Sequence, residues 1–190
     1  MGADRDMMIW EWLAGLEGGV LLWFQETLRG PVQDAAVMAF TSLGNSGILF
    51  IVAGVILLFF KKTRRVGMAA LLALLIGFLI TNLTLKPLVS RPRPWLDVEG
   101  LINLVGESAY RSFPSGHSTS AFAFGFALLF GAPKKWMKWA AMVVAVLMGI
   151  SRLYVGVHYP TDIVGGILVG LLAGWIAWLL CKRIRSKYIL

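Results

Sequence analysis

Cysteine is almost absent from this sequence. Cys181 is the only one, so no intramolecular disulfide can form, and no CxxC or Cys/His group offers a zinc site. Charged residues are also scarce: they make up 15% of the 190 residues, whereas about a quarter is usual in a soluble domain. The N-terminal MGADRDMMIW lacks the basic leader and apolar core of a secretory signal. With 58% apolar residues, the composition favours a membrane protein.

Five apolar segments are long enough to cross a bilayer, which takes roughly 17 to 25 residues. We therefore predict an all-α fold, an integral membrane helical bundle with five transmembrane helices. One domain would cover residues 1–190, with a helical core at 31–181 and a basic tail at 182–190. The predicted spans are residues 43–60, 66–85, 115–132, 136–155 and 163–181.

The first thirty residues differ from these spans. Glu11, Glu17 and Glu26 interrupt the apolar run of residues 8–28. Carboxylates are costly in hydrocarbon, so we expect residues 1–30 to form an amphipathic helix that lies in the membrane interface. A sixth span is the alternative. Pro31 would then open a short helix, which the small residues of SLGNSG end.

Basic residues gather in three places: between the first and second spans, between the third and fourth, and after the fifth. Five spans put all three clusters on one side, which the positive-inside rule makes the cytoplasm, together with the C-terminus. Eleven of the eighteen basic residues are explained in this way, and no nucleic-acid partner is needed. They are Lys61, Lys62, Arg64, Arg65, Lys134, Lys135, Lys138, Lys182, Arg183, Arg185 and Lys187.

Three polar stretches fall on the opposite side: KPLVSRPRP at residues 86–94, FPSGHS at 113–118 and SRLYVGVHYPTD at 151–162. Their cations call for an anionic ligand, and phosphate suits the planar fork of arginine and the point charge of lysine. The helix start after Pro114 adds free N–H groups, and the small Ser115 and Gly116 let a ligand approach them. These stretches predict a phosphate site on the outer face. The cations in and near it are Lys86, Arg91, Arg93, Arg111 and Arg152.

The two histidines of the chain suggest catalysis in addition to binding. His158 and Asp162 are four residues apart, so the carboxylate can fix the imidazole tautomer and leave the other nitrogen free to attack phosphorus. His117 has no carboxylate nearby in sequence and is the candidate general acid. A hydrogen-bonded packing role for His158 is the alternative. Arg91 and Arg111 have a second interpretation as anchors to lipid headgroups.

Together, the three stretches resemble the three-part signature of the type 2 phosphatidic acid phosphatase superfamily. K-x6-R-P is matched from Lys86 to Pro94, P-S-G-H at residues 114–117 and S-R-x5-H-x3-D from Ser151 to Asp162. The resemblance covers about residues 37–181 and implies a helical membrane bundle and a metal-independent phosphatase without cofactor. It makes His158 the nucleophile, Asp162 its partner and His117 the general acid. The implied phosphate-binding groups are Lys86, Arg93, Ser115, Gly116 and Arg152, with Arg91, Tyr110 and Arg111 as accessory residues.

The resemblance also bears on substrate and location. It implies a bacterial cell-membrane enzyme that cleaves the phosphate or diphosphate of a lipid on the outer face, through a phospho-histidine. We favour undecaprenyl diphosphate over phosphatidylglycerophosphate and phosphatidate. Transfer of the phosphoryl group to another lipid, phosphate-lipid binding without turnover, and hydrolysis of soluble phosphates are the alternatives. Asp97, Glu99 and Glu107 are further candidates to line the entrance.

Overall fold

Every regular element in residues 2–183, the part of the chain that the computed structural model describes, is helical. The all-α prediction is confirmed for these residues. The α-helices are α1 (Gly2–Leu28), α2 (Pro31–Ser42), α3 (Ile48–Leu58), α4 (Arg64–Phe78), α5 (Lys86–Val89), α6 (Pro94–Asp97), α7 (Gly116–Gly131), α8 (Lys135–Tyr154) and α9 (Pro160–Lys182). A 3-10 turn, η1 (Asn45–Gly47), precedes α3, and a π-helical stretch, η2 (Leu79–Leu85), joins α4 to α5.

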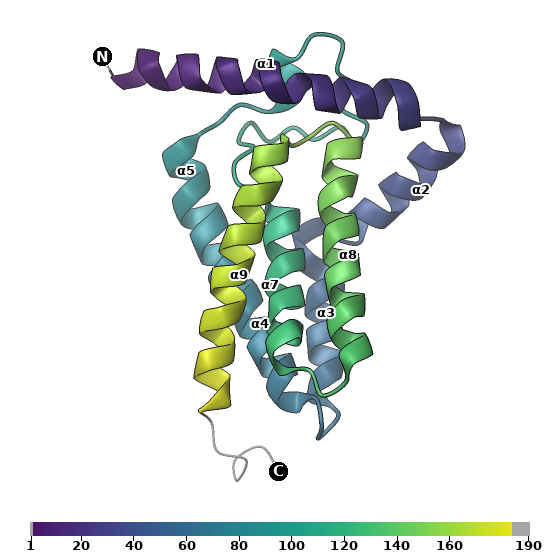
Figure 1. Cartoon of the computed structure of the whole chain (residues 1–190), viewed down its shortest axis with the longest axis vertical. Helices are drawn as coiled ribbons and strands as arrows, with labels where there is room; N and C mark the ends of the chain where they lie inside the picture. The colour runs from purple at the N-terminus through teal and green to yellow at the C-terminus, as the bar shows by residue number, and fades with distance from the viewer. Residues whose placement is uncertain (1, 184–190) are drawn as a thin grey trace.

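Small residues bring α7 and α9 close together at the centre of the bundle. A Cβ on Gly166 would lie 2.7 Å from the Cβ of Ser118, and one on Gly170 would lie 2.8 Å from the backbone nitrogen of Ala123. Helices in membranes pack closely through such positions. Helices α4 and α8 also pack against α7, and Figure 1 shows α7 inside the bundle. The start of α7 is thereby held at the middle of one end of the bundle.

The structure has three or four candidate membrane spans among the described residues, where five were predicted. The continuous helical stretch Arg64–Asp97, α8 and α9 are each long and apolar enough. Helix α2 with the segment Asn45–Leu58 makes a fourth only if the pair, bent by 46°, counts as one span. The difference has two causes: the SLGNSG break shortens α3 to 11 residues, and α7 has only 16. An integral, multi-pass helical architecture remains.

Helix α1 lies across the end of the bundle where α8 ends and α9 begins (Figure 1). It is absent from the candidate spans found among the described residues. Part of α1 packs against the loop after α6: a Cβ on Gly18 would lie 3.1 Å from Val98, and Gln25 donates a hydrogen bond to the carbonyl of Gly100 at 2.9 Å. The exposed residues of α1 include the large apolar side chains of Trp12, Leu16, Val20, Trp23 and Leu28.

The segments that carry the basic clusters lie at the end of the bundle opposite α1. They are the loop between α3 and α4, the loop between α7 and α8, and the last turn of α9 (Figure 1). The grouping of these clusters on one side therefore agrees with the arrangement of the helices. Arg185, Lys187 and most of the predicted tail at 182–190 lie outside the described residues.

Candidate active site

The three polar stretches meet at the end of the bundle that α1 covers. Lys86 begins α5, His117 lies in the first turn of α7, and His158 lies in the short loop between α8 and α9. Together with Arg93 and Gly116 they line a cavity of about 530 Å³. Residues from distant parts of the sequence thus share one cavity, as the sequence predicted.

The cavity is cationic at one end and apolar at the other. Besides the polar residues above, its lining includes apolar side chains of α3 and α4, of which Ile51, Leu75 and Phe78 are exposed on the outside of the described bundle. A ligand that fills the cavity would carry an anionic head and a hydrocarbon tail. The apolar residues are Ile51, Leu71, Leu74, Leu75 and Phe78.

His158 and Asp162 form the pair that their spacing predicted. Nδ1 of His158 lies 3.2 Å from Oδ2 of Asp162, and that same oxygen accepts a hydrogen bond from the Tyr159 N–H at 2.9 Å. Because Oδ2 is an acceptor, Nδ1 carries the proton, and Nε2 keeps its lone pair. Burial of the imidazole, followed by the nearby cations Arg93 and Arg152, lowers the pKa of His158 well below its usual value. The histidine is therefore buried and neutral, with a lone pair on Nε2.

Arg93 lies beside the nitrogen that keeps this lone pair. Its Nη1 is 2.9 Å from Nε2 of His158 and donates to the carbonyl of Val157 at 2.8 Å. Its Nη2 is 3.7 Å from a carboxylate oxygen of Glu107. For Nε2 to attack a phosphorus atom, Arg93 must pass its hydrogen bond from the imidazole to the phosphoryl group.

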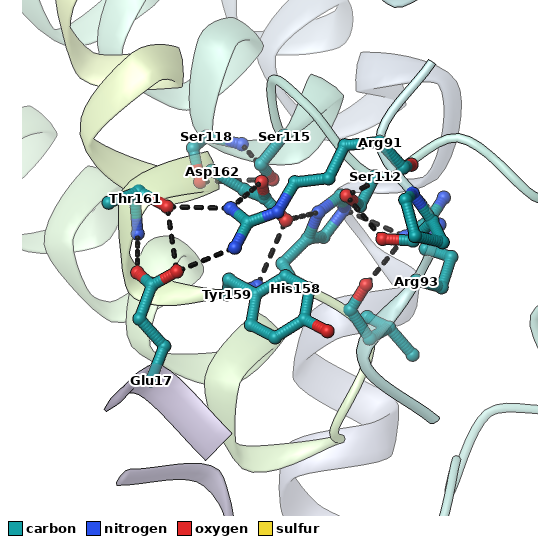
Figure 2. A network of polar contacts seen from close by, with 12 residues as sticks. Glu17, Arg91, Arg93, Ser112, Ser115, Ser118, His158, Tyr159, Thr161 and Asp162 are labelled. Carbon is teal, nitrogen blue, oxygen red and sulfur yellow. Dashed lines mark hydrogen bonds and ion pairs between the residues drawn. The ribbon is translucent and has the colours of Figure 1, made fainter. Parts of the chain in front are cut away.

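The two arginines of RPRP face different sides. Arg91, Pro92 and Arg93 have no helical structure, and the two arginines make different contacts. Arg91 donates to Oδ1 of Asp162 at 3.0 Å and to Glu17 at 2.7 Å, as Figure 2 shows. Arg91 is therefore placed behind the His158–Asp162 pair, and Arg93 is placed in the cavity.

His117 contacts a residue that the sequence did not single out. Its Nε2 lies 3.0 Å from the side-chain oxygen of Asn45, which follows the break after α2. An amide oxygen accepts hydrogen bonds, so this contact forms when Nε2 of His117 carries a proton. His117 lines the same cavity as Glu107.

Ser115 and Gly116 do different things in the first turn of α7. The Ser115 N–H donates to the backbone carbonyl of Asp162 at 3.0 Å, and its Oγ accepts from the Ser118 N–H at 3.3 Å as the helix N-cap. The predicted phosphate contact of the Ser115 backbone is therefore already occupied by protein. Gly116 does line the cavity.

Arg152 lines a second cavity and not the first. It lines a polar cavity of about 370 Å³ together with Thr41, Asn45 and Glu107. Its Nη1 donates to the Thr41 hydroxyl at 2.9 Å. Among the described residues, its Nε is the one buried side-chain nitrogen or oxygen without a hydrogen-bond partner. Arg152 therefore keeps a donor for a ligand.

Other predicted site residues lie elsewhere. Tyr110 and Arg111 are exposed and line neither cavity, so the structure gives them no accessory role in this site. Glu107 lines both cavities. No group of three or more His, Cys, Asp or Glu side chains able to hold a metal occurs within residues 2–183.

Sequence reasoning missed Glu17, Thr41 and Asn45. Glu17 carried a signal, because a carboxylate in an apolar run is often functional, but its partner lies far away in the chain. Thr41 and Asn45 gave no signal beyond the turn composition of SLGNSG.

Comparison with known proteins gives concordant results. The model of the PAP2 superfamily matches residues 66–186, more than half of the chain. The undecaprenyl-diphosphatase of Sulfolobus acidocaldarius is 32% identical over 143 residues, 75% of this chain and 67% of the relative. The lipid A 1-phosphatase of Rhizobium etli is 35% identical over 162 residues, 73% of this chain and 66% of the relative.

A solved structure is similar over nearly the whole length. It is the crystal structure of a transmembrane PAP2-type phosphatidylglycerolphosphate phosphatase from Bacillus subtilis. The two chains are 30% identical, the TM-score is 0.72, and the match covers 96% of each chain.

Proposed function

We propose that this chain, which belongs to the PAP2 superfamily of metal-independent membrane lipid phosphatases, acts on undecaprenyl diphosphate. It would hydrolyse this lipid through a phospho-histidine. The observation that carries the mechanism is the buried His158–Asp162 pair beside Arg93, in a cavity with one cationic and one apolar end. Phosphatidylglycerophosphate and phosphatidate are the alternative substrates.

In the first step, the lone pair on Nε2 of His158 forms a bond to the terminal phosphorus. The bond between that phosphorus and the leaving oxygen breaks, and His117 gives the departing oxygen a proton. Asp162 stabilises the imidazolium as positive charge develops. In the second step, His117 takes a proton from water, the water oxygen bonds to phosphorus, and the P–N bond breaks, which releases inorganic phosphate.

The cations of the site supply most of the binding. Lys86 and Arg93 line the main cavity, and Arg152 lines the polar cavity, with which the main cavity shares Glu107. Fixed cations stabilise the charge on the equatorial oxygens of the transferring phosphoryl group. Three of them suit a diphosphate, which carries more negative charge than a monophosphate. The apolar end would receive the first part of the polyprenyl chain.

The name of the Sulfolobus relative supports a polyprenyl diphosphate, whereas the Rhizobium and Bacillus relatives are named for other lipid phosphates. We therefore keep phosphatidylglycerophosphate in every assay. Transfer of the phosphoryl group to a lipid alcohol is a further alternative, because an alcohol could replace water in the second step.

We also propose the topology predicted from the sequence: five spans, with the site on the outer face of a bacterial cell membrane and the C-terminus in the cytoplasm. The position of the basic connections opposite the site supports this orientation. Helix α1 would lie in the outer interface, with the indoles of Trp12 and Trp23 in contact with lipid.

The test is phosphate release in detergent with EDTA present, from undecaprenyl diphosphate and from phosphatidylglycerophosphate. We expect release by the wild type, faster from the diphosphate, and none by His158→Ala. Equal release by both proteins would refute the nucleophile, and loss of activity in EDTA that magnesium restores would refute metal independence. A phosphorylated lipid acceptor, in place of free phosphate, would identify a phosphotransferase.

A further inference from the structure

Glu17 of α1 is buried against the first turn of α9. One of its oxygens accepts a hydrogen bond from the Thr161 N–H at 2.6 Å, and the other accepts from the Thr161 hydroxyl at 2.9 Å. Thr161 is the second residue of α9, so its N–H is one of the donors that a helix leaves unpaired at its start. Glu17 therefore caps, from another helix, the helix that carries Asp162.

Arg91 connects Glu17 to Asp162. Its guanidinium lies between the two carboxylates in Figure 2, at 2.7 Å from Glu17 and 3.0 Å from Asp162. It also donates to the Thr161 hydroxyl at 2.6 Å and stacks 3.8 Å from the ring centre of Tyr159. A buried guanidinium held in this way has one orientation, because its fork is planar and its donors point in fixed directions. Glu17 supplies one of the contacts that hold this orientation.

Both carboxylate oxygens of Asp162 are engaged. Oδ1 accepts from Arg91, while Oδ2 accepts from the Tyr159 N–H and faces Nδ1 of His158. Rotation of the carboxylate toward or away from Arg91 would therefore turn the imidazole. The contacts form one continuous series from Glu17 through Arg91 and Asp162 to the nucleophile.

We propose that Glu17 is a positioning residue: through Arg91 it holds Asp162 in the orientation that aims His158 at the phosphorus. The inference rests on the proposed function and adds α1, which lies outside all three signature stretches, to the catalytic apparatus. A purely structural role predicts lower stability with unchanged turnover in the protein that stays folded. A positioning role predicts a lower kcat with nearly unchanged KM, because other cations bind the phosphoryl group.

The experiment compares wild type, Glu17→Gln and Glu17→Asp with the matched control Glu26→Gln, which removes a carboxylate from an exposed position of the same helix. We would measure kcat and KM for undecaprenyl diphosphate and phosphatidylglycerophosphate in detergent, and thermal unfolding. Glu17→Gln should lower kcat by about 10- to 100-fold, the scale on which a misplaced catalytic group acts, and change KM by less than about threefold. Glu17→Asp should recover part of the loss, and Glu26→Gln should match the wild type.

A double mutant tests the route of the effect. In an Asp162→Asn background, Glu17→Gln should cause no further loss of kcat, because its partner in catalysis is already gone. Independent, multiplying losses would overturn the proposal, as would wild-type kcat in Glu17→Gln. If Glu17→Gln does not fold, Glu17→Asp decides: a lower kcat at unchanged KM supports the proposal, and a lower unfolding temperature alone contradicts it.

Failure of the proposed function would be visible separately, as phosphate release that survives His158→Ala. If the wild type releases phosphate from neither lipid, orthovanadate replaces turnover as the probe, because it can take up the geometry of the phosphoryl transition state. The rise in unfolding temperature that vanadate causes should then be smaller in Glu17→Gln than in Glu26→Gln. Equal rises would overturn the positioning role.

Discussion

The proposed mechanism depends on the lone pair on Nε2 of His158. Burial and the cations Arg93 and Arg152 lower its pKa, so the imidazole stays neutral until the pH falls well below its usual pKa of about 6.5. We therefore expect the acid limb of the kcat/KM profile that belongs to the nucleophile to lie well below pH 6.5. Replacing Arg93 by Gln removes a positive charge and should move this limb upward, measured with undecaprenyl diphosphate across the acid range. A limb fixed near 6.5 in both proteins would contradict this.

Glu107 is the one carboxylate that lines both cavities. Its carboxylate lies 3.7 Å from Arg93, where it competes with a phosphoryl group for the same guanidinium. Glu107→Gln should therefore lower KM about three- to tenfold, the effect expected from a partly exposed charge, with kcat little changed. Glu99→Gln, at an exposed position of the same loop, is the control. A raised KM would show instead that Glu107 positions Arg93.

At the scale of helices, the site was predictable where its chemistry is local. His158 and Asp162 are four residues apart and meet at the start of α9, and the PSGH turn opens α7 as expected. Contacts between distant segments were not predictable. Glu17 lies 144 residues from Thr161, and Asn45 lies 72 residues from His117, so no periodicity or spacing relates them.

The bend before α3 was not predictable either. The apolar content of residues 43–60 predicted one span, but Ser46 and Gly47, both at positive φ, bend the chain before α3.

The contact between α7 and α9 gives a prediction at the same scale. A Cβ on Gly166 would lie 2.9 Å from the Ser115 carbonyl oxygen, and backbone cannot move away as a flexible side chain does. Gly166→Ala should destabilise the protein by about 1–3 kcal/mol and lower activity as well, because Ser115 caps the helix that carries His117. Gly19→Ala on α1 is the control: a Cβ there would meet nothing within 4 Å, and alanine favours a helix more than glycine does. The unfolding temperature of this variant should therefore be equal to that of the wild type or higher. An unchanged unfolding temperature in Gly166→Ala would mean that the two helices can separate without cost.

At the scale of the whole molecule, the arrangement serves a lipid substrate. The anionic head of a lipid stays near the membrane surface while its tail stays in hydrocarbon, so the nucleophile must sit at the end of the bundle. The loop that carries His158 joins the ends of two long helices under α1, and the apolar lining of the cavity comes from α3 and α4. The same arrangement separates the site from the basic connections, which lie at the other end.

The proposed orientation can be tested with single cysteines, because Cys181 is the only natural one and is buried. Tyr110 is exposed in the loop at the site end, and Lys62 is exposed in the α3–α4 connection at the opposite end. In intact cells, a membrane-impermeant maleimide should label Tyr110→Cys but not Lys62→Cys, and permeabilised cells should show labelling of both. The wild type measures the background from Cys181. Labelling of Lys62→Cys alone in intact cells would invert the topology and place lipid hydrolysis at the cytoplasmic face, whereas the histidine chemistry would be unaffected.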